Sequence, residues 1–335
     1  MGAVDFLVQN NLSYELTPIH LRELIFLSTL PCDIYGFIEN IFHIVMHKEQ
    51  LINRDSLRKV VDLGLAQLFV RIEDYQNLVK DNQAKLLKIT RSLSLGDLLV
   101  NGKKQVYYLS LNLDYLHKNP IDDETLLLQY QCLIGLGKLL QDKTALIPSL
   151  YQYLAGQSYH YTIAQPLLSS LMLLGFLKSV QQFSEKEITS LFVASYFKDI
   201  GMALIPKDAL NRSDLSVHEK DLISRHQDFS GEILDGRIPL NPNYFNIIRN
   251  HHHHSLLVPN NLEINKVLTG TETLFIESTD VITAITNRRP YREKLPLFSG
   301  LKLVKNFMGE EHYQEFKMLV WFLQKFFKFG GSMPE

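Results

Sequence analysis

The sequence has little cysteine, little net charge and no long hydrophobic run. Its 335 residues include two cysteines, Cys32 and Cys132, too few for a disulfide framework or a cysteine-based zinc site. The 34 Lys and Arg residues nearly balance the 36 Asp and Glu residues, so the formal net charge is -2. Proteins that bind nucleic-acid polymers by bulk electrostatics carry a basic excess, and we therefore expect no such partner.

No segment of the sequence has the pattern of an export signal or a membrane anchor. The first residues lack a basic region, and the most apolar run, residues 167–177, is far shorter than the roughly 20 residues that cross a bilayer. The content of 46% hydrophobic and 21% charged residues is typical of globular proteins. We expect a cytoplasmic protein without a membrane partner.

Residues 1–100 are expected to form a small α+β domain with a regulatory or sensory role. Their pattern predicts two strands, a short amphipathic helix, a third strand and a long linking helix, over residues 34–47, 53–63, 68–72 and 73–99 respectively. This part shows no spacing typical of catalytic or metal-binding residues.

Residues 101–335 are expected to be helical almost throughout, so the protein as a whole is expected to be mainly α. The polar stretch 96–104, which contains two glycines, is the predicted junction. Capping boxes at Ser184–Glu187 and Ser216–Glu219 predict the start of two helices, the second of which carries His226.

Histidine and aspartate residues flanked by apolar residues recur in successive predicted helices. They are His160, Asp199, His226, His251, His252 and Asp280. Imidazole and carboxylate ligands together suit divalent iron, manganese or zinc, and one aspartate can bridge two such ions. Two bridged metals can activate water and bind a phosphoryl oxygen. Each histidine taken alone is typical of a hydrogen-bonded core residue, and only the ordered set favours a metal site.

Four segments resemble the motifs of the HD-GYP family, bacterial phosphohydrolases of the HD superfamily. Residues 197–206, Phe-Lys-Asp-Ile-Gly-Met-Ala-Leu-Ile-Pro, resemble its His-Asp-Ile-Gly-Lys-Ile-Gly-Ile-Pro segment. Residues 225–234 resemble its His-Pro-x-x-Gly-x-x-Ile-Leu helix, and residues 250–252 match its paired histidines. Residues 280–292 resemble its Asp-Val-Phe-Asp-Ala-Leu-Thr-Ser-Asp-Arg-Pro-Tyr-Arg block. The similarity covers about residues 150–330.

The resemblance implies an all-helical HD-type phosphohydrolase domain preceded by the small α+β domain. It also implies two divalent transition-metal ions, iron first and manganese or zinc as alternatives, and hydrolysis of the bacterial signalling molecule cyclic-di-GMP. The implied metal ligands are the six residues His160, Asp199, His226, His251, His252 and Asp280, with Asp199 bridging the ions. Arg289, and less closely Arg292, match arginines near the substrate phosphate, a contact that suits the planar guanidinium.

The catalytic motif departs from the family pattern at several positions. Lys198 stands where the family has a metal-binding histidine, and with Asp199 it is the residue on which we expect catalysis to depend most. Met202 replaces a lysine, and Thr283 replaces an aspartate. An ammonium group cannot bind a metal unless its pKa is strongly depressed. We therefore expect impaired hydrolysis or an altered substrate.

The Gly-Tyr-Pro loop of the family is also missing, and Pro259-Asn-Asn261 stands at about its place. This leaves two functions open. One is a metal-dependent phosphodiesterase that binds phosphate or a cyclic dinucleotide. The other is a degenerate regulatory protein that keeps the binuclear centre, does not hydrolyse cyclic-di-GMP and binds a protein partner at the loop around residues 255–262.

Overall fold

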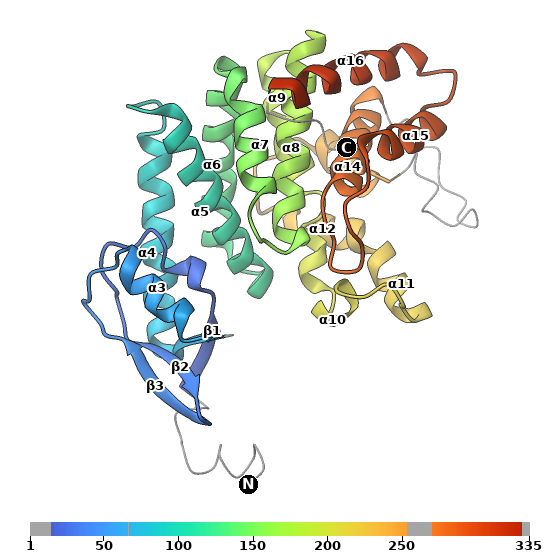
Figure 1. The fold of residues 1–335 in the computed structure, drawn as a ribbon. Coiled ribbons are helices and arrows are strands. Elements are labelled where there is room, and N and C mark those ends of the chain that lie inside the picture. Colours follow the sequence, from blue (N-terminus) through green and yellow to red (C-terminus); the bar gives the residue numbers. More distant parts are fainter. Residues whose placement is uncertain (1–14, 66, 253–269, 330–335) are drawn as a thin grey trace. The chain divides into compact units, whose positions relative to one another are not determined.

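The computed structural model of the protein describes residues 15–65, 67–252 and 270–329. It divides into two compact units, Met1–Leu86 and Leu87–Glu335, which we call the α+β unit and the helical unit (Figure 1). This is the fold class that the sequence predicts.

The division lies inside helix α4 (Ile72–Arg91), whereas the sequence placed the junction at residues 96–104. Asp97 caps the N-terminus of α5 (Leu98–Lys118) by accepting hydrogen bonds from two backbone N–H groups, and Gly96 has a φ of +71°. The polar stretch is therefore a turn between two helices, followed by the first turns of α5.

The α+β unit contains a four-stranded antiparallel sheet with strand order β1-β4-β2-β3. Its elements are β1 (Leu16–Ile19), η1 (Leu21–Glu23), β2 (Ile34–Ile38), β3 (Ile41–Met46), α3 (Arg54–Asp62), β4 (Leu68–Arg71) and the first part of α4. One face of the sheet packs on the helices, because Ile34, Leu68 and Val70 share a buried cluster with Val60 of α3 and Leu78 of α4.

The predicted strands and the predicted short helix of this unit are confirmed. Glu39 and Asn40 join β2 to β3 with positive φ angles of 50° and 65°, the geometry of a two-residue hairpin turn. Strand β1 was not predicted, because it is four residues long and contains Pro18, a residue that disfavours strands.

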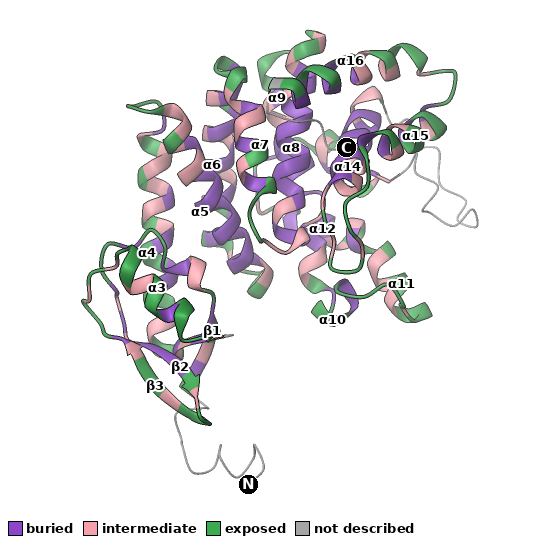
Figure 2. Ribbon diagram, viewed as in Figure 1, coloured by how far each residue is buried: buried purple, intermediate pink, exposed green. Residues whose placement is uncertain are grey.

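The helical unit is built around α8 (Tyr161–Val180), which packs against α5, α6, α7, α9, α14 and α16. The remaining elements are α6 (Asp123–Asp142), η2 (Thr144–Leu146), α7 (Ile147–Ala155), α9 (Glu185–Phe197), η3 (Ile200–Leu204), α10 (Lys207–Leu210), α11 (Val217–Ser224), α12 (His226–Leu234), α13 (Pro242–Arg249), α14 (Thr271–Thr286), α15 (Leu297–Met308) and α16 (Tyr313–Phe329). Figure 2 shows the buried residues concentrated in α5 to α9 and α14.

Helix α8 is the one helix among the described residues that is long and apolar enough to cross a membrane. Its most apolar window is 78% buried inside the protein. A helix that is apolar on all sides and covered by other helices is typical of the centre of a large core. Its hydropathy is explained by this position.

Gly201 lies where η3 and α12 approach each other closely. A Cβ atom at this position would lie 2.6 Å from the backbone nitrogen of Ser230 and 2.8 Å from Cβ of Phe229, and it would also overlap the carbonyl oxygen of His226. The Gly201 N–H donates a hydrogen bond of 2.8 Å to the Ser230 hydroxyl. This contact fixes the distance between the ends of two segments that carry chemistry, at Asp199 and His226.

We therefore predict that Gly201→Ala destabilises the protein by about 2 kcal/mol or more, because backbone atoms must move to admit the methyl group. The matched control is Gly156→Ala at the end of α7, where the nearest atom would lie 3.4 Å away and φ is -79°. This control is expected to be neutral or stabilising by up to about 1 kcal/mol. Urea unfolding measures the free energy of unfolding of both variants. Equal values for Gly201→Ala and Gly156→Ala would contradict the close packing at Gly201.

Candidate metal centre

The turn after α9 places Asp199. A capping box between Ser184 and Glu187 begins α9, as the sequence predicted, and the helix ends at Lys198. The hydroxyl of Ser230 in α12 donates a hydrogen bond of 2.6 Å to the carbonyl of Lys198. The end of α9 is therefore tied to the helix that carries His226.

Two helix boundaries place the histidines. The sequence predicted one continuous helix from Ser216 through His226. Instead, α11 ends with Arg225 as its C-cap residue, and a new helix, α12, begins at His226. The break turns the imidazole of His226 into the core, where the residue is 3% exposed. His251 and His252 follow the C-cap residue Asn250 of α13, whose N-terminus is capped by Asn241.

Four of the predicted ligands lie together: Asp199, His226, His251 and His252 each offer one ligand atom, and these atoms lie within 4.8 Å of one another. Three of the atoms form a nearly equilateral triangle. The distances are 3.2 Å between Nε2 of His226 and Nε2 of His251, 3.2 Å from His251 Nε2 to Asp199 Oδ1, and 3.3 Å from His226 Nε2 to Asp199 Oδ1. Ligand atoms about 2.1 Å from one ion lie roughly 3.0–3.4 Å apart, so the triangle has the size of a coordination face.

Hydrogen bonds at Nδ1 of His226 and of His251 determine which ring nitrogen carries a proton. Nδ1 of His226 lies 2.6 Å from the carbonyl oxygen of Ile223, and Nδ1 of His251 lies 2.7 Å from that of Ile248. A carbonyl can only accept, so each Nδ1 carries a proton, and in its neutral form each ring turns the lone pair of Nε2 toward Asp199. Three electron-pair donors then face one another, an arrangement that a cation stabilises.

Burial favours the ligand form of these side chains. Burial lowers the pKa of His251 below its ordinary value, although contact with Asp199 opposes this effect. Burial and the neighbouring His251 and His226 hold the pKa of His252 well below its ordinary value. Burial alone would raise the pKa of Asp199, but the ammonium of Lys198 holds it well below its ordinary value. The cluster therefore contains the neutral imidazoles of His251 and His252 and the carboxylate of Asp199 near neutral pH.

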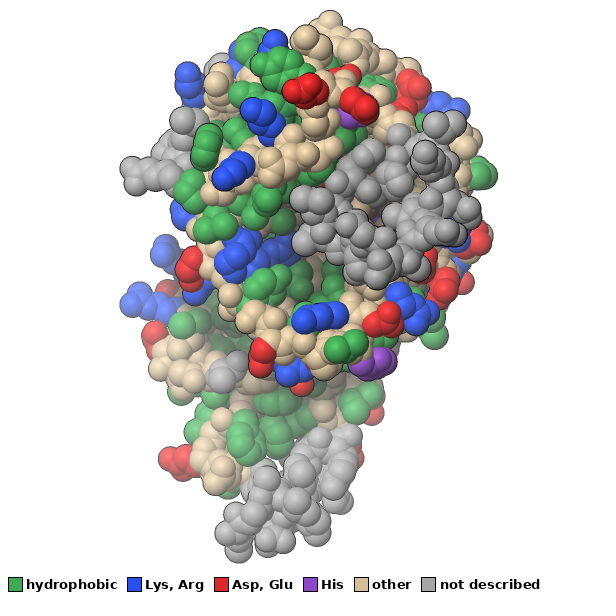
Figure 3. Space-filling view, turned by 90° about the vertical axis from the view of Figure 1, so that its right-hand side faces the viewer, with side chains coloured by type: hydrophobic (Ala, Val, Ile, Leu, Met, Phe, Trp, Pro, Cys, Tyr) green, Lys and Arg blue, Asp and Glu red, His purple; other side chains and the backbone are tan. Residues whose placement is uncertain are grey.

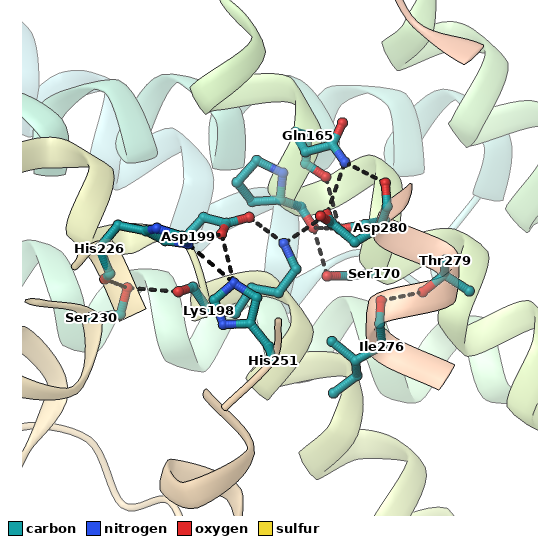
Figure 4. A network of polar contacts seen from close by, with 12 residues as sticks. Gln165, Ser170, Lys198, Asp199, His226, Ser230, His251, Ile276, Thr279 and Asp280 are labelled. Atoms are coloured by element: carbon teal, nitrogen blue, oxygen red, sulfur yellow. Dashed lines mark hydrogen bonds and ion pairs between the residues drawn. The ribbon is translucent and has the colours of Figure 1, made fainter. Parts of the chain in front are cut away.

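A second cluster lies on the other side of Asp199 (Figure 4). Nζ of Lys198 contacts Oδ2 of Asp199 and lies 2.7 Å from Oδ1 of Asp280 in α14. Gln165 of α8 donates hydrogen bonds of 2.8 Å to Asp280 Oδ1 and 3.0 Å to the Asp280 carbonyl. Burial alone would lower the pKa of Lys198, but Asp199 and Asp280 raise it above its ordinary value, so the lysine carries its charge.

The structure does not bring His160 into either cluster. His160 is the N-cap residue of α8, with Nδ1 2.8 Å from Oγ1 of Thr162 and Nε2 3.1 Å from Oδ1 of Asn211. Burial lowers its pKa, and the Asn211 contact opposes this effect.

The two predicted phosphate-binding arginines have different surroundings. The guanidinium of Arg289 stacks over the ring of Tyr161, 4.1 Å from its centroid. Arg292 instead donates hydrogen bonds to the carbonyls of Ala284 and Ile285 near the C-terminus of α14. The structure thus places Arg289 beside the residue that follows His160 and uses Arg292 to bind the end of a helix.

Figure 3 shows lysine and arginine side chains spread among acidic and hydrophobic ones on the face of the helical unit that it presents. The predicted partner loop at residues 255–262, with the Pro259–Asn261 stretch, lies outside the described residues.

Sequence reasoning missed several residues around the site. Gln165 and Ser230 hold Asp280 and the end of α9 in place, and single polar residues inside apolar helices carry no recognisable spacing. His117 at the end of α5 was also missed, although Asp114 and His117 share one face of that helix. Burial lowers the pKa of His117 to about 4, with smaller effects from Asp114, Lys207, His160 and Asp199.

No known family model matches this sequence, and no curated protein matches it. Among solved structures, Bd1817, described as a HDG"Y"P protein from Bdellovibrio bacteriovorus, is similar in fold. The TM-score is 0.62 at 11% sequence identity, and the match covers 92% of this chain and 100% of that chain. At this identity the similarity shows the fold, and it extends over both the α+β unit and the helical unit.

The lowered pKa of His117 predicts a pH dependence of folding. The unfolded chain takes up a proton at this residue near pH 6.5, whereas the folded chain does so only near pH 4. Stability is therefore expected to fall as the pH falls from 6.5 to about 4, and His117→Gln should reduce this fall by on the order of 1–3 kcal/mol. Urea unfolding of the metal-free chain at several pH values measures the effect. The exposed His218→Gln on α11 is the control, and a His117→Gln profile equal to that of the wild type would contradict the assignment.

Proposed function

We propose that the protein is a metal-dependent phosphohydrolase that cleaves a phosphodiester, with a cyclic dinucleotide such as cyclic-di-GMP as its substrate. The observation that carries the proposal is the triangle of Asp199 Oδ1, His226 Nε2 and His251 Nε2, three electron-pair donors 3.2–3.3 Å apart in the protein interior. The HD-type fold and the motif resemblance support it. The neighbouring His252 supplies a fourth donor within 4.8 Å.

The residues present fit one transition-metal ion. Imidazole nitrogen and carboxylate oxygen are ligands that iron, manganese and zinc all accept, and a four-donor set leaves room for substrate or water. When bound, such an ion supplies Lewis acidity toward a phosphoryl oxygen and lowers the pKa of a water toward about 7. Iron remains our first candidate because of the motif resemblance.

The protein's own residues prepare this site in three ways. The carbonyls of Ile223 and Ile248 hold two histidine rings in the tautomer that presents Nε2. Asp199 keeps its charge at neutral pH because its pKa is held low. Arg289, stacked on Tyr161, presents a cation in the helical unit that can pair with a phosphate oxygen.

The second candidate function is that of a degenerate regulatory protein, in which the centre stabilises the fold and the phosphodiester is not cleaved. The favouring observation is Lys198, which is buried at the position of a family metal ligand and engages two carboxylates. Metal binding without turnover of cyclic-di-GMP or of the simple diester bis(p-nitrophenyl) phosphate would select this function. Turnover of either compound by the metal-loaded chain would select the enzyme.

His226→Gln is predicted to lower metal affinity by at least the roughly 10–100-fold that loss of a mere supporting partner costs, because it removes a direct ligand. Hydrolysis should fall in parallel. Metal content after dialysis and the rate on bis(p-nitrophenyl) phosphate are the measurements, and His312→Gln near the start of α16 is the control. Full metal content in His226→Gln would show that the ion binds elsewhere in the protein.

Arg289→Ala is predicted to raise KM for the diester about tenfold or more with metal content unchanged, since a charged hydrogen bond to phosphate contributes about 1.5–3 kcal/mol. The matched control is Arg288→Ala. That arginine is 78% exposed and pairs with Glu293 at 3.0 Å, so the change should alter neither quantity. Loss of metal from Arg289→Ala would contradict a phosphate-binding role.

A further inference from the structure

Lys198 occupies the space between two carboxylates in the interior of the helical unit. Its side chain is 1% exposed, its Nζ contacts Asp199 Oδ2, and the distance to Asp280 Oδ1 is 2.7 Å. Gln165 donates to the same oxygen of Asp280 at 2.8 Å and so fixes the carboxylate in place. The lysine, the two aspartates and the glutamine form one continuous polar network (Figure 4).

This is the place where the sequence motifs put a second metal ion, bound by His160, Asp199 and Asp280. Among the described residues no imidazole lies there, because the nitrogens of His160 contact Thr162 and Asn211. An ion between the two aspartates would displace the ammonium from both of its carboxylate partners. A charged lysine left without partners in the interior is strongly unfavourable.

The charges of the cluster also disfavour a second metal ion between the two aspartates. The carboxylates of Asp199 and Asp280 and the ammonium of Lys198 together leave one negative charge, which one divalent ion more than neutralises. A second divalent ion would add two further positive charges beside the ammonium, in a region where burial weakens screening by water.

We propose that the ammonium of Lys198 takes the place of the second metal ion, so that each chain binds one divalent transition-metal ion. Asp199 then bridges a metal ion through Oδ1 and an ammonium through Oδ2. Asp280 belongs to the ammonium and is not a metal ligand. This inference rests on the proposed metal centre at Asp199, His226, His251 and His252.

The test is the number of metal ions per chain. The full chain is stripped with a chelator, reloaded with Zn²⁺ and separately with Mn²⁺, desalted and measured by mass spectrometry of the metals. One ion per chain is the expected result. Two ions per chain in the wild type would overturn the role of Lys198 and leave the proposed function standing, whereas no bound ion would overturn the proposed function itself.

Two variants test the roles of Lys198 and Asp280 separately. Lys198→His supplies an imidazole beside the two carboxylates and should raise the content to two ions, while Lys220→His on the exposed face of α11 should keep it at one. Asp280→Asn should lower the melting temperature but retain the single ion, since its partner is the lysine. A Lys198→His chain with one ion, or an Asp280→Asn chain without metal, would overturn the inference. If Lys198→His does not fold, the metal contents of the wild type and of Asp280→Asn decide whether the inference stands.

Discussion

The two oxygens of the buried Asp199 carboxylate face different groups, and the centre of the helical unit is arranged around the need of this negative charge for positive partners on both sides. One oxygen lies 3.2–3.3 Å from two imidazole nitrogens whose protons point away, and the other contacts a buried ammonium. A single ionised carboxylate in a protein interior is costly, so both sides need a positive partner. Lys198 is one partner, and the site that Asp199 forms with His226 and His251 can hold a metal ion as the other.

The helices around this carboxylate serve to hold its neighbours at fixed distances. The close contact at Gly201 and the hydroxyl of Ser230 join the end of α9 to α12, and Gln165 joins α8 to α14. Each of these contacts is made by a small or neutral residue. Asp199 and His251 lie 52 residues apart in the sequence, so the alignment of their ligand atoms depends on this packing.

Much of the fold and part of the site could be predicted from the sequence. Capping boxes at Ser184 and Ser216 are local signals, and the fold class and four of the six predicted ligands follow from such signals and from motif order. The engagement of His160 with Asn211 could not be predicted, because it depends on where a helix N-terminus meets a distant turn. The helix break at Arg225 and the pairing of Lys198 with Asp280 are likewise decided by tertiary contacts, which override local preference.

The most direct test of the account is a crystal structure of the metal-loaded chain with anomalous diffraction measured at the absorption edge of the metal. The account predicts one anomalous peak, about 2.1 Å from Asp199 Oδ1, His226 Nε2 and His251 Nε2. It also predicts Nζ of Lys198 between Asp199 and Asp280. The absence of a peak at the triangle would contradict the metal centre, and a second peak between the two aspartates would contradict the role of the lysine.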